Sequence, residues 1–165
     1  MEIALVRVDN RLVHGQIIEA WVPFIHAGCI VVVDDDVASD FFRETVIKMA
    51  VPHDVEVMVY SVRTFAEQSA RLSSGSRKKA IVLFSTIADA LKAYRLGFLF
   101  SELNVGNIYT EACRRQLSSC VLLNDEDMEG IRELLDLHVQ IELRRVPREK
   151  PVPVIDLGEG TTTTP

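Results

Sequence analysis

The sequence predicts an α/β protein with an open, mainly parallel sheet and helices on both faces, a three-layer α/β/α arrangement. Segments rich in valine, isoleucine and leucine alternate with amphipathic segments along the chain, and this alternation is typical of βαβ units. The apolar segments are solidly hydrophobic, like the strands of a parallel sheet buried between helices. The chain has 165 residues and no internal repeat, so one domain fits it better than two.

Each expected element follows from its own pattern. Short apolar runs predict strands at residues 2–8, 29–33, 55–60, 80–84, 102–105, 120–123 and 139–146. Helical spacing of apolar residues predicts helices at 15–27, 38–50, 62–72, 86–97 and 126–137. Pro23 lies inside the first helix and should kink or divide it. Thr86, with Asp89 three residues later, and Asn124 stand where N-caps are expected.

The domain is expected to span residues 1–150. Beyond Pro147 the chain becomes polar and rich in proline, and four threonines precede its last residue. We therefore expect a disordered C-terminal tail over residues 151–165. Serine and glycine at residues 73–76 predict a surface loop.

Composition excludes some classes of function. The net charge of −6 argues against general nucleic-acid binding, which needs a basic face, although a small phosphate site can be locally positive. No apolar run is long enough to span a bilayer and no secretory leader is evident, which predicts a cytoplasmic protein. The three cysteines form no CxxC pair and no cluster with the histidines, so we expect them to be reduced and buried.

Ligands of open α/β sheets lie beyond the carboxyl ends of the strands. This rule selects four loops, at residues 9–15, 34–36, 85–86 and 106–109. In the second loop, three consecutive aspartates could attract Mg²⁺ in a phosphatase-like site, but no partner lysine and Thr/Ser loop is evident. We interpret residues 34–36 as an acidic strand end that caps the next helix, and we expect no metal and no other cofactor.

The first loop carries the chemistry. His14 lies at a strand-to-helix turn, close in sequence to Asp9 and Arg11. Free backbone N–H groups and a partial positive charge make a helix N-terminus suited to phosphate. A neutral imidazole can accept a phosphoryl group, Arg11 could bind the added negative charge, and Asp9 could fix one tautomer of the imidazole. The chain lacks GxxxxGK[ST] and has no GxGxxG after its first strand, so neither nucleotide fingerprint is present.

Residues 7–16, RVDNRLVHGQ, resemble the active-site signature of B components (IIB) of the mannose/fructose/sorbose family of the phosphoenolpyruvate-dependent sugar phosphotransferase system. The resemblance continues at residues 30–38, IVVVDDDVA, and at 103–106, LNVG, and it covers about residues 1–150. It implies an open, mainly parallel α/β fold. The chain departs from the family pattern at Asn107, where a second glycine is common, and again at residues 108–111.

The resemblance implies that a phosphorylated A component (IIA) gives its phosphoryl group to His14, at Nδ1. His14 then passes it to a sugar that enters through membrane C and D components (IIC and IID), which select the sugar. The chain would thus be a phosphotransferase, peripherally associated with the membrane transporter. Asp9 and Arg11 match the loop residues around the phosphorylated histidine. Further candidate site residues are those that complete this loop and the neighbouring strand ends: Asn10, Gly15, Gln16, Ser85, Thr86 and Gly106.

Two alternatives stay open at the level of sequence. The chain could be a stand-alone phosphocarrier that reports to a regulator, or a non-catalytic, flavodoxin-like binding module in which His14 only contacts a ligand. A homodimer would be unsurprising. Trp21 is expected in the core, and the other histidines at the surface or at helix ends: His26, His53 and His138. The three arginines near the last strand are either a solvated strand end or a source of a second cation for the site: Arg144, Arg145 and Arg148.

Overall fold

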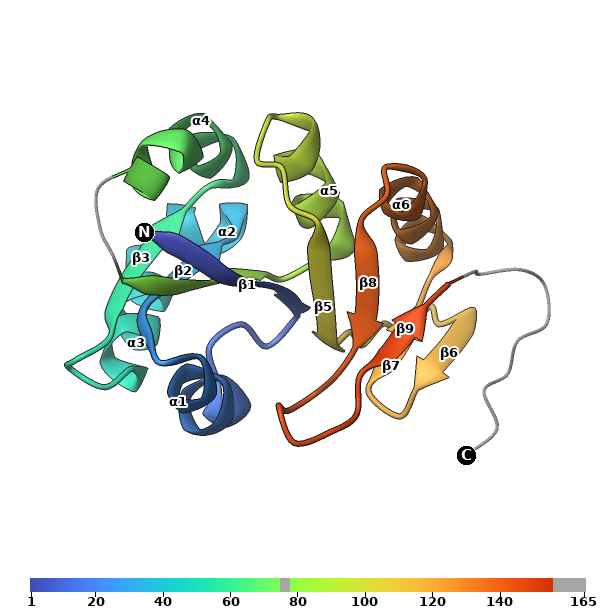
Figure 1. The fold of residues 1–165 in the computed structure, drawn as a ribbon, viewed down its shortest axis with the longest axis horizontal. Helices are drawn as coiled ribbons and strands as arrows, with labels where there is room; N and C mark the ends of the chain where they lie inside the picture. The colour runs from blue at the N-terminus through green and yellow to red at the C-terminus, as the bar shows by residue number, and fades with distance from the viewer. Residues whose placement is uncertain (75–77, 156–165) are drawn as a thin grey trace.

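The computed structural model describes residues 1–74 and 78–155 and has the predicted three-layer α/β/α architecture (Figure 1). Within these residues, seven strands form one sheet in the order β3-β2-β4-β1-β5-β8-β9, and β6 pairs with β7 in a separate hairpin. The strands are β1 (Glu2–Asp9), β2 (Ala27–Val33), β3 (Glu56–Tyr60), β4 (Lys79–Phe84), β5 (Glu102–Asn107), β6 (Arg115–Ser118), β7 (Val121–Leu123), β8 (Gln140–Leu143) and β9 (Val152–Val154). Only β9 runs antiparallel to its neighbour in the seven-stranded sheet that these described residues form.

The helices cover the sheet on both faces. They are the π-helix η1 (Gln16–Trp21), α1 (Val22–Ile25), α2 (Asp35–Ser39), α3 (Phe41–Ala50), α4 (Val62–Ser74), α5 (Ile87–Arg95) and α6 (Asp125–Asp136). Figure 1 shows α4, α5 and α6 on one side of the sheet and α1 and α3 on the other. Within the described ranges, no helix is both long enough and apolar enough to cross a membrane.

Two of the predicted helices are divided. The helix expected at 15–27 consists of η1 followed by α1, and Pro23 lies in the first turn of α1, where a missing N–H costs least. The helix expected at 38–50 is instead α2 and α3, separated by Asp40. Asp40 has an extended backbone, and its carboxylate accepts hydrogen bonds from the N–H groups of Phe42 and Arg43. The break is therefore a new helix start with its own N-cap.

The sheet separates two hydrophobic clusters. Phe65, Ile87 and Leu134 bring α4, α5 and α6 into the first cluster, whereas Ile17 and Trp21 bring η1 into the second. The connections that leave β1 and β4 thus lie on opposite faces of the sheet. Since β1 and β4 are adjacent, their carboxyl ends form a topological switch point, where ligands of such sheets bind.

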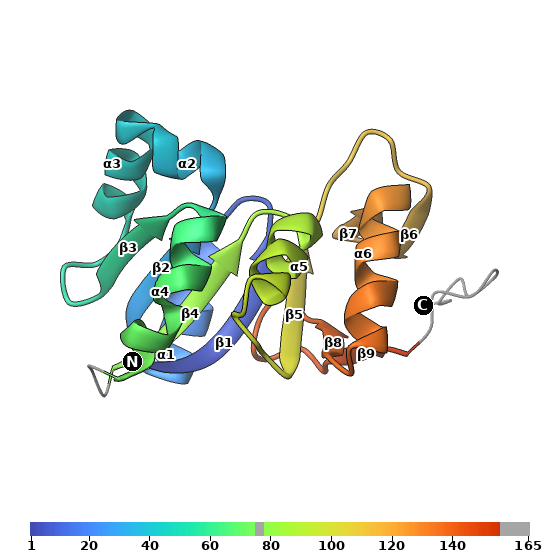
Figure 2. The same ribbon diagram turned by 90° about the horizontal axis from the view of Figure 1, so that it is seen from above.

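The C-terminal part of the chain differs from the prediction. The expected domain ended at residue 150, but Val152–Val154 form β9 and pair with β8. The β6–β7 hairpin, which was not predicted as such, docks on the end of β5 through hydrogen bonds between Ile108 and residues 120 and 122. Figure 2 shows this hairpin beside α6, at the end of the molecule away from α3. Residues 156–165 of the expected tail lie outside the described residues. So do 75–77 of the expected loop, and α4 continues to Ser74.

The predicted cap at Asn124 can be tested by substitution. Its side chain accepts a hydrogen bond from the N–H of Asp127 at 2.8 Å, and the Asp127 carboxylate accepts one from the N–H of Asn124 at 3.2 Å. Asn124→Ala removes the cap, and we expect the free energy of unfolding to fall by about 1 kcal/mol. Urea denaturation measures the change. Glu129→Ala, an exposed substitution in the same helix, should change stability by less than about 0.5 kcal/mol; equal effects of the two substitutions would contradict the cap.

Candidate functional site

The loop after β1 is a tight turn that is anchored in the core. The N–H of Leu12 donates to the carbonyl oxygen of Asp9 at 2.8 Å, and the Leu12 side chain is buried in the second cluster. Leu12 has φ of 54°, a left-handed conformation that side chains with a Cβ rarely adopt. Burial of its side chain holds the strained turn in place. This turn sets His14 beyond the carboxyl end of β1.

Asp9 fixes the tautomer of His14. Its Oδ2 lies 2.9 Å from Nε2 of the imidazole, and its carboxylate is fully buried. On the other side of the ring, Nδ1 accepts a hydrogen bond from the backbone N–H of Gln16 at 3.3 Å. A carboxylate needs a donor and an N–H needs an acceptor, so Nε2 carries the proton and Nδ1 keeps its lone pair. The imidazole is 15% exposed, enough for a reaction partner to reach it.

Arg7 lies behind Asp9, completely buried, with its guanidinium held on several sides. Nη2 donates to Oδ2 of Asp9 at 2.9 Å and to the carbonyl oxygen of Arg145 at 3.2 Å. Nη1 donates to the carbonyl oxygen of Arg144 at 2.8 Å and to the side-chain oxygen of Asn104. The guanidinium carbon also lies 5.4 Å from the ring centre of Trp21, within cation–π distance.

The pKa of Asp9 reflects these contacts. Burial pushes the pKa of Asp9 upward, but the hydrogen bond with His14 and the positive charge of Arg7 outweigh burial, so the pKa lies below its ordinary value. Burial lowers the pKa of Arg7, while the charge of Asp9 opposes this change. An arginine stays protonated even so. Asp9 is therefore an ionised acceptor next to His14 at neutral pH.

Gly106 makes room for Arg7. A Cβ at Gly106 would lie 1.7 Å from Nη2 and 1.9 Å from the guanidinium carbon, closer than any two nonbonded atoms approach. The neighbouring Asn107, where the chain departs from the family pattern, binds the first loop. Its side chain donates to the side-chain oxygen of Asn10, and its carbonyl oxygen accepts from the N–H of Asn10 at 3.0 Å.

Arg11 lies on the open side of the site. Its Nη2 donates to the side-chain oxygen of Gln16 at 2.9 Å, and its Nε is 3.4 Å from Oδ1 of Asp9. The side chain is 46% exposed. Arg11 and Gln16 thus lie beside the imidazole of His14. Gly15 is the N-cap of η1. The sequence analysis expected free N–H groups at this helix N-terminus, but those of Ile17 and Ile18 already donate to the carbonyl oxygen of His14.

The other predicted loops are occupied by helix caps. Thr86 and Ser85 both donate their hydroxyl groups to the Asp89 carboxylate, and the described contacts bring neither to His14. Asp34 caps α2, which confirms its interpretation as a strand-end cap, and Asp35 pairs with Lys92. Within residues 1–74 and 78–155, no three His, Cys, Asp or Glu side chains form a group that could hold a metal ion.

The sequence analysis missed Arg7 and Asn104 as site residues. The available signal was an arginine in the middle of a mainly apolar strand, since a buried charge needs a partner. The arginines after β8 were considered as a source of a second cation, but it is the carbonyl oxygens of Arg144 and Arg145 that reach the site. Their side chains instead bind the segment itself, Arg144 at carbonyl oxygens of 147 and 149 and Arg145 at the Glu149 carboxylate.

Gly106→Ala should strongly destabilise the protein. The new methyl group would displace the Arg7 guanidinium and break a buried ion pair, which typically costs about 3–5 kcal/mol. We expect a loss of this order in the free energy of unfolding, measured by urea denaturation, or failure to fold. Gly15→Ala is the matched control, because a Cβ there meets its nearest atom only at 3.9 Å and φ is −51°. A Gly106→Ala protein as stable as Gly15→Ala would show that Arg7 is not held as described.

Comparison with known proteins shows which family the chain belongs to. Residues 3–163 match the family model described as PTS system sorbose subfamily IIB component. The chain is 33% identical over 151 residues to the fructose-specific EIIB component of Bacillus subtilis, covering 90% of this chain and 91% of that protein. It is 26% identical to the mannose-specific EIIAB component of Escherichia coli K12 over 160 residues, 95% of this chain and 48% of that one.

Solved structures of similar fold belong to the same family. The crystal structure of the IIBSor domain of the sorbose permease from Klebsiella pneumoniae superimposes with a TM-score of 0.81 at 30% sequence identity, and 94% of each chain is covered. The same fold thus recurs over nearly the whole length of both chains. The family match and the structural match together show that this chain is a IIB component of the sorbose subfamily of the phosphotransferase system.

Proposed function

We propose that the chain is a phosphohistidine carrier, which accepts a phosphoryl group at Nδ1 of His14 and passes it to a sugar. The observation that carries this proposal is the 2.9 Å contact between Nε2 of His14 and the ionised Asp9. This contact favours a proton on Nε2 and a lone pair on Nδ1, which can attack phosphorus once the N–H of Gln16 moves aside. A carboxylate orients a reactive histidine in this way in many enzymes.

The first transfer needs no proton movement at the ring. Nδ1 forms a bond to the phosphorus of the phosphorylated A component while the bond between phosphorus and the donor atom breaks. Nε2 keeps its hydrogen, and the positive charge that develops on the imidazole is stabilised by Asp9. The N–H of Gln16, which donates to Nδ1 at 3.3 Å, becomes free to donate to an oxygen of the bound phosphoryl group.

Arg11 is a cation that can bind the phosphoryl group. Its guanidinium is held near the ring by Gln16 and Asp9 but is about half exposed, so it can turn toward the added negative charge. Phosphoryl transfer depends mainly on positioning and on stabilising charge on the moving group. The mannose-specific relative carries A and B parts in one chain, which supports a phosphorylated A component as donor. Membrane C and D components would bring the sugar to phosphorylated His14.

His14→Ala should abolish phosphorylation by a phosphorylated A component. The other histidines are matched controls. His26 and His138 have φ of 56° and 65°, so asparagine, which tolerates this conformation, should replace them with little strain; His53 is exposed and can become alanine. We expect each control to keep most of the acid-labile, base-stable phosphate of the wild type. Such phosphate on His14→Ala would move the acceptor elsewhere.

The second half of the proposal has its own readout. Wild-type protein labelled at His14 should lose its phosphate to sugar when membranes that contain the cognate C and D components are added. It should keep the phosphate with sugar alone. Label that reaches no sugar under any of these conditions would favour the stand-alone regulatory carrier.

Arg11→Ala should slow phosphoryl transfer by about tenfold to a hundredfold, since a charge-assisted contact contributes about 1.5–3 kcal/mol and each 1.36 kcal/mol is about tenfold in rate. Arg11→Lys should recover only part of the rate, because lysine keeps the charge but lacks the planar fork. Stopped-flow transfer gives the rates, and circular dichroism checks the fold. Arg63→Ala, which removes an exposed arginine of α4, is the control. Wild-type rates for folded Arg11→Ala would remove Arg11 from the site.

A further inference from the structure

Arg7 is a charged group of the site that the transfer steps above do not use. It cannot touch a phosphoryl group, because its side chain is fully buried and its guanidinium is shared among Asp9, Asn104 and two carbonyl oxygens. Burying an ion pair costs several kcal/mol per ion before the charges attract each other, so such a pair is a poor device for stability alone. The contact between Arg7 and Asp9 therefore points to an effect of Arg7 on the position and charge of Asp9.

The Arg7 contacts leave little freedom in orientation. Asn104 donates its side-chain NH₂ to Oε1 of Glu142 at 3.0 Å and to the carbonyl oxygen of Arg144 at 3.3 Å. Both partners accept, so the amide oxygen of Asn104 has to face Arg7. Arg7 in turn has one guanidinium orientation that meets all its acceptors. Asp9 is thereby fixed with Oδ2 between Nη2 of Arg7 and Nε2 of His14.

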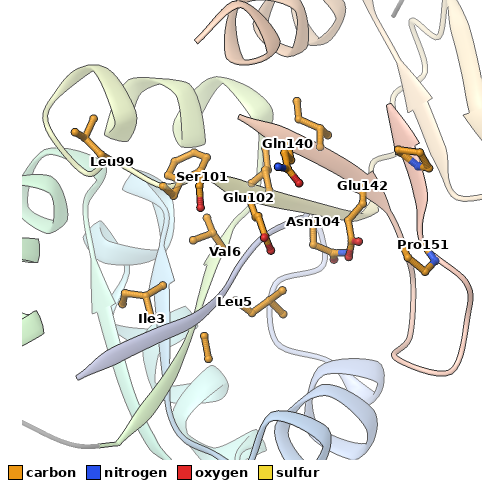
Figure 3. A pocket seen from close by; sticks show the side chains of 15 residues that line it. Ile3, Leu5, Val6, Leu99, Ser101, Glu102, Asn104, Gln140, Glu142 and Pro151 are labelled. Carbon is orange, nitrogen blue, oxygen red and sulfur yellow. The ribbon is translucent and has the colours of Figure 1, made fainter. Parts of the chain in front are cut away.

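The far end of this network lies at a groove. A cavity of about 720 Å³ on the sheet face away from α4, α5 and α6 is lined by Asn104, Glu142 and Glu102, among others. Figure 3 shows the side chains of Asn104 and Glu142 next to each other at this groove. Glu142 is only half-buried, so its charge can remain solvated while one oxygen accepts from Asn104. The network therefore runs from solvent to His14 without an uncompensated buried charge on a side chain.

We propose that Arg7 is a positioning residue for phosphoryl transfer at His14, and that Asn104 with Glu142 keeps Arg7 in place. This inference rests on the proposed function of His14. Arg7 acts through Asp9 in two ways. Its hydrogen bond holds the carboxylate against Nε2, and its positive charge balances the negative charge of Asp9.

The sign of the effect follows from the charges. Without Arg7, the buried Asp9 carboxylate has His14 as its main remaining partner, so a proton on Nδ1 is favoured and the lone pair is lost. Other charged groups face the pair from each neighbouring element. Arg11 approaches Asp9 from the loop, Glu142 binds Asn104 from β8, and Glu149, paired with Arg145, lies on the segment before β9. None of these charged groups is removed by a substitution at Arg7.

The test is Arg7→Met, which keeps much of the side-chain volume and removes the charge. We expect the acid limb of the pH–rate profile for phosphorylation of His14 to move to higher pH by about one unit, because Asp9, which contacts the imidazole, loses the positive charge that balances it. Below the midpoint, the rate then falls about tenfold. In the unphosphorylated protein, ¹⁵N chemical shifts of His14 should lose the pattern of protonated Nε2 and unprotonated Nδ1 near neutral pH.

Three further variants keep the test decisive. Arg7→Lys restores the positive charge but not the planar guanidinium with its several donors. The pH profile should therefore return toward that of the wild type while the rate stays low. Asn104→Ala removes one acceptor and should move the profile in the same direction by less, which tests the network even if Arg7→Met does not fold. Arg63→Met controls for loss of an exposed arginine. The proposal is falsified if a folded Arg7→Met or Asn104→Ala keeps both the wild-type profile and the wild-type ¹⁵N pattern.

The outcomes separate this inference from the proposed function. The ¹⁵N measurement needs no phosphoryl donor, so it reports on Arg7 even if His14 never accepts phosphate. If wild-type His14 takes no phosphoryl group, the carrier function fails, whatever the ¹⁵N spectra show. If transfer proceeds with the same rate and pH profile in Arg7→Met, the carrier function stands and the role of Arg7 is overturned.

Discussion

The buried ion pair between Arg7 and Asp9 is the constraint around which this site is built. Two charges removed from water need near-complete compensation, and the protein supplies it from three other parts of the chain. Asn104 comes from β5, two carbonyl oxygens come from the segment after β8, and the ring of Trp21 comes from η1. Gly106 lacks a side chain where the guanidinium lies. His14, whose imidazole is 15% exposed, lies in front of this buried pair.

The residues near each other in sequence could be identified without the structure. Asp9, Arg11 and His14 stand within six positions, and a strand followed by a helix is enough to bring them together. The contacts of Arg7 behind these residues could not be identified from the sequence, because its partners lie 97 and 137 residues further along the chain. Periodicity within one segment carries no information on such pairs. Gly106 was singled out by its place after a strand and by resemblance, and only its distance to Arg7 explains why glycine is required there.

The misplaced elements have physical causes of their own. The helix expected at 38–50 has continuous helical spacing, yet Asp40 caps a new helix because its short side chain competes for backbone N–H groups. β9 was not predicted, since Val152–Val154 contain a proline and lie in a polar stretch. At the edge of a sheet a proline is tolerated, because one side of the strand needs no partner.

The segment from Arg144 to Glu149 links the site to the order in which the chain is made. The loop that carries His14 is synthesised well before residues 144 and 145, whose carbonyl oxygens hold Arg7. A nascent chain, or one shortened before residue 144, has the histidine without the support behind it. Such a fragment lacks part of the network that fixes Asp9 against the imidazole, so the arrangement around His14 is completed only after residue 145 has been added.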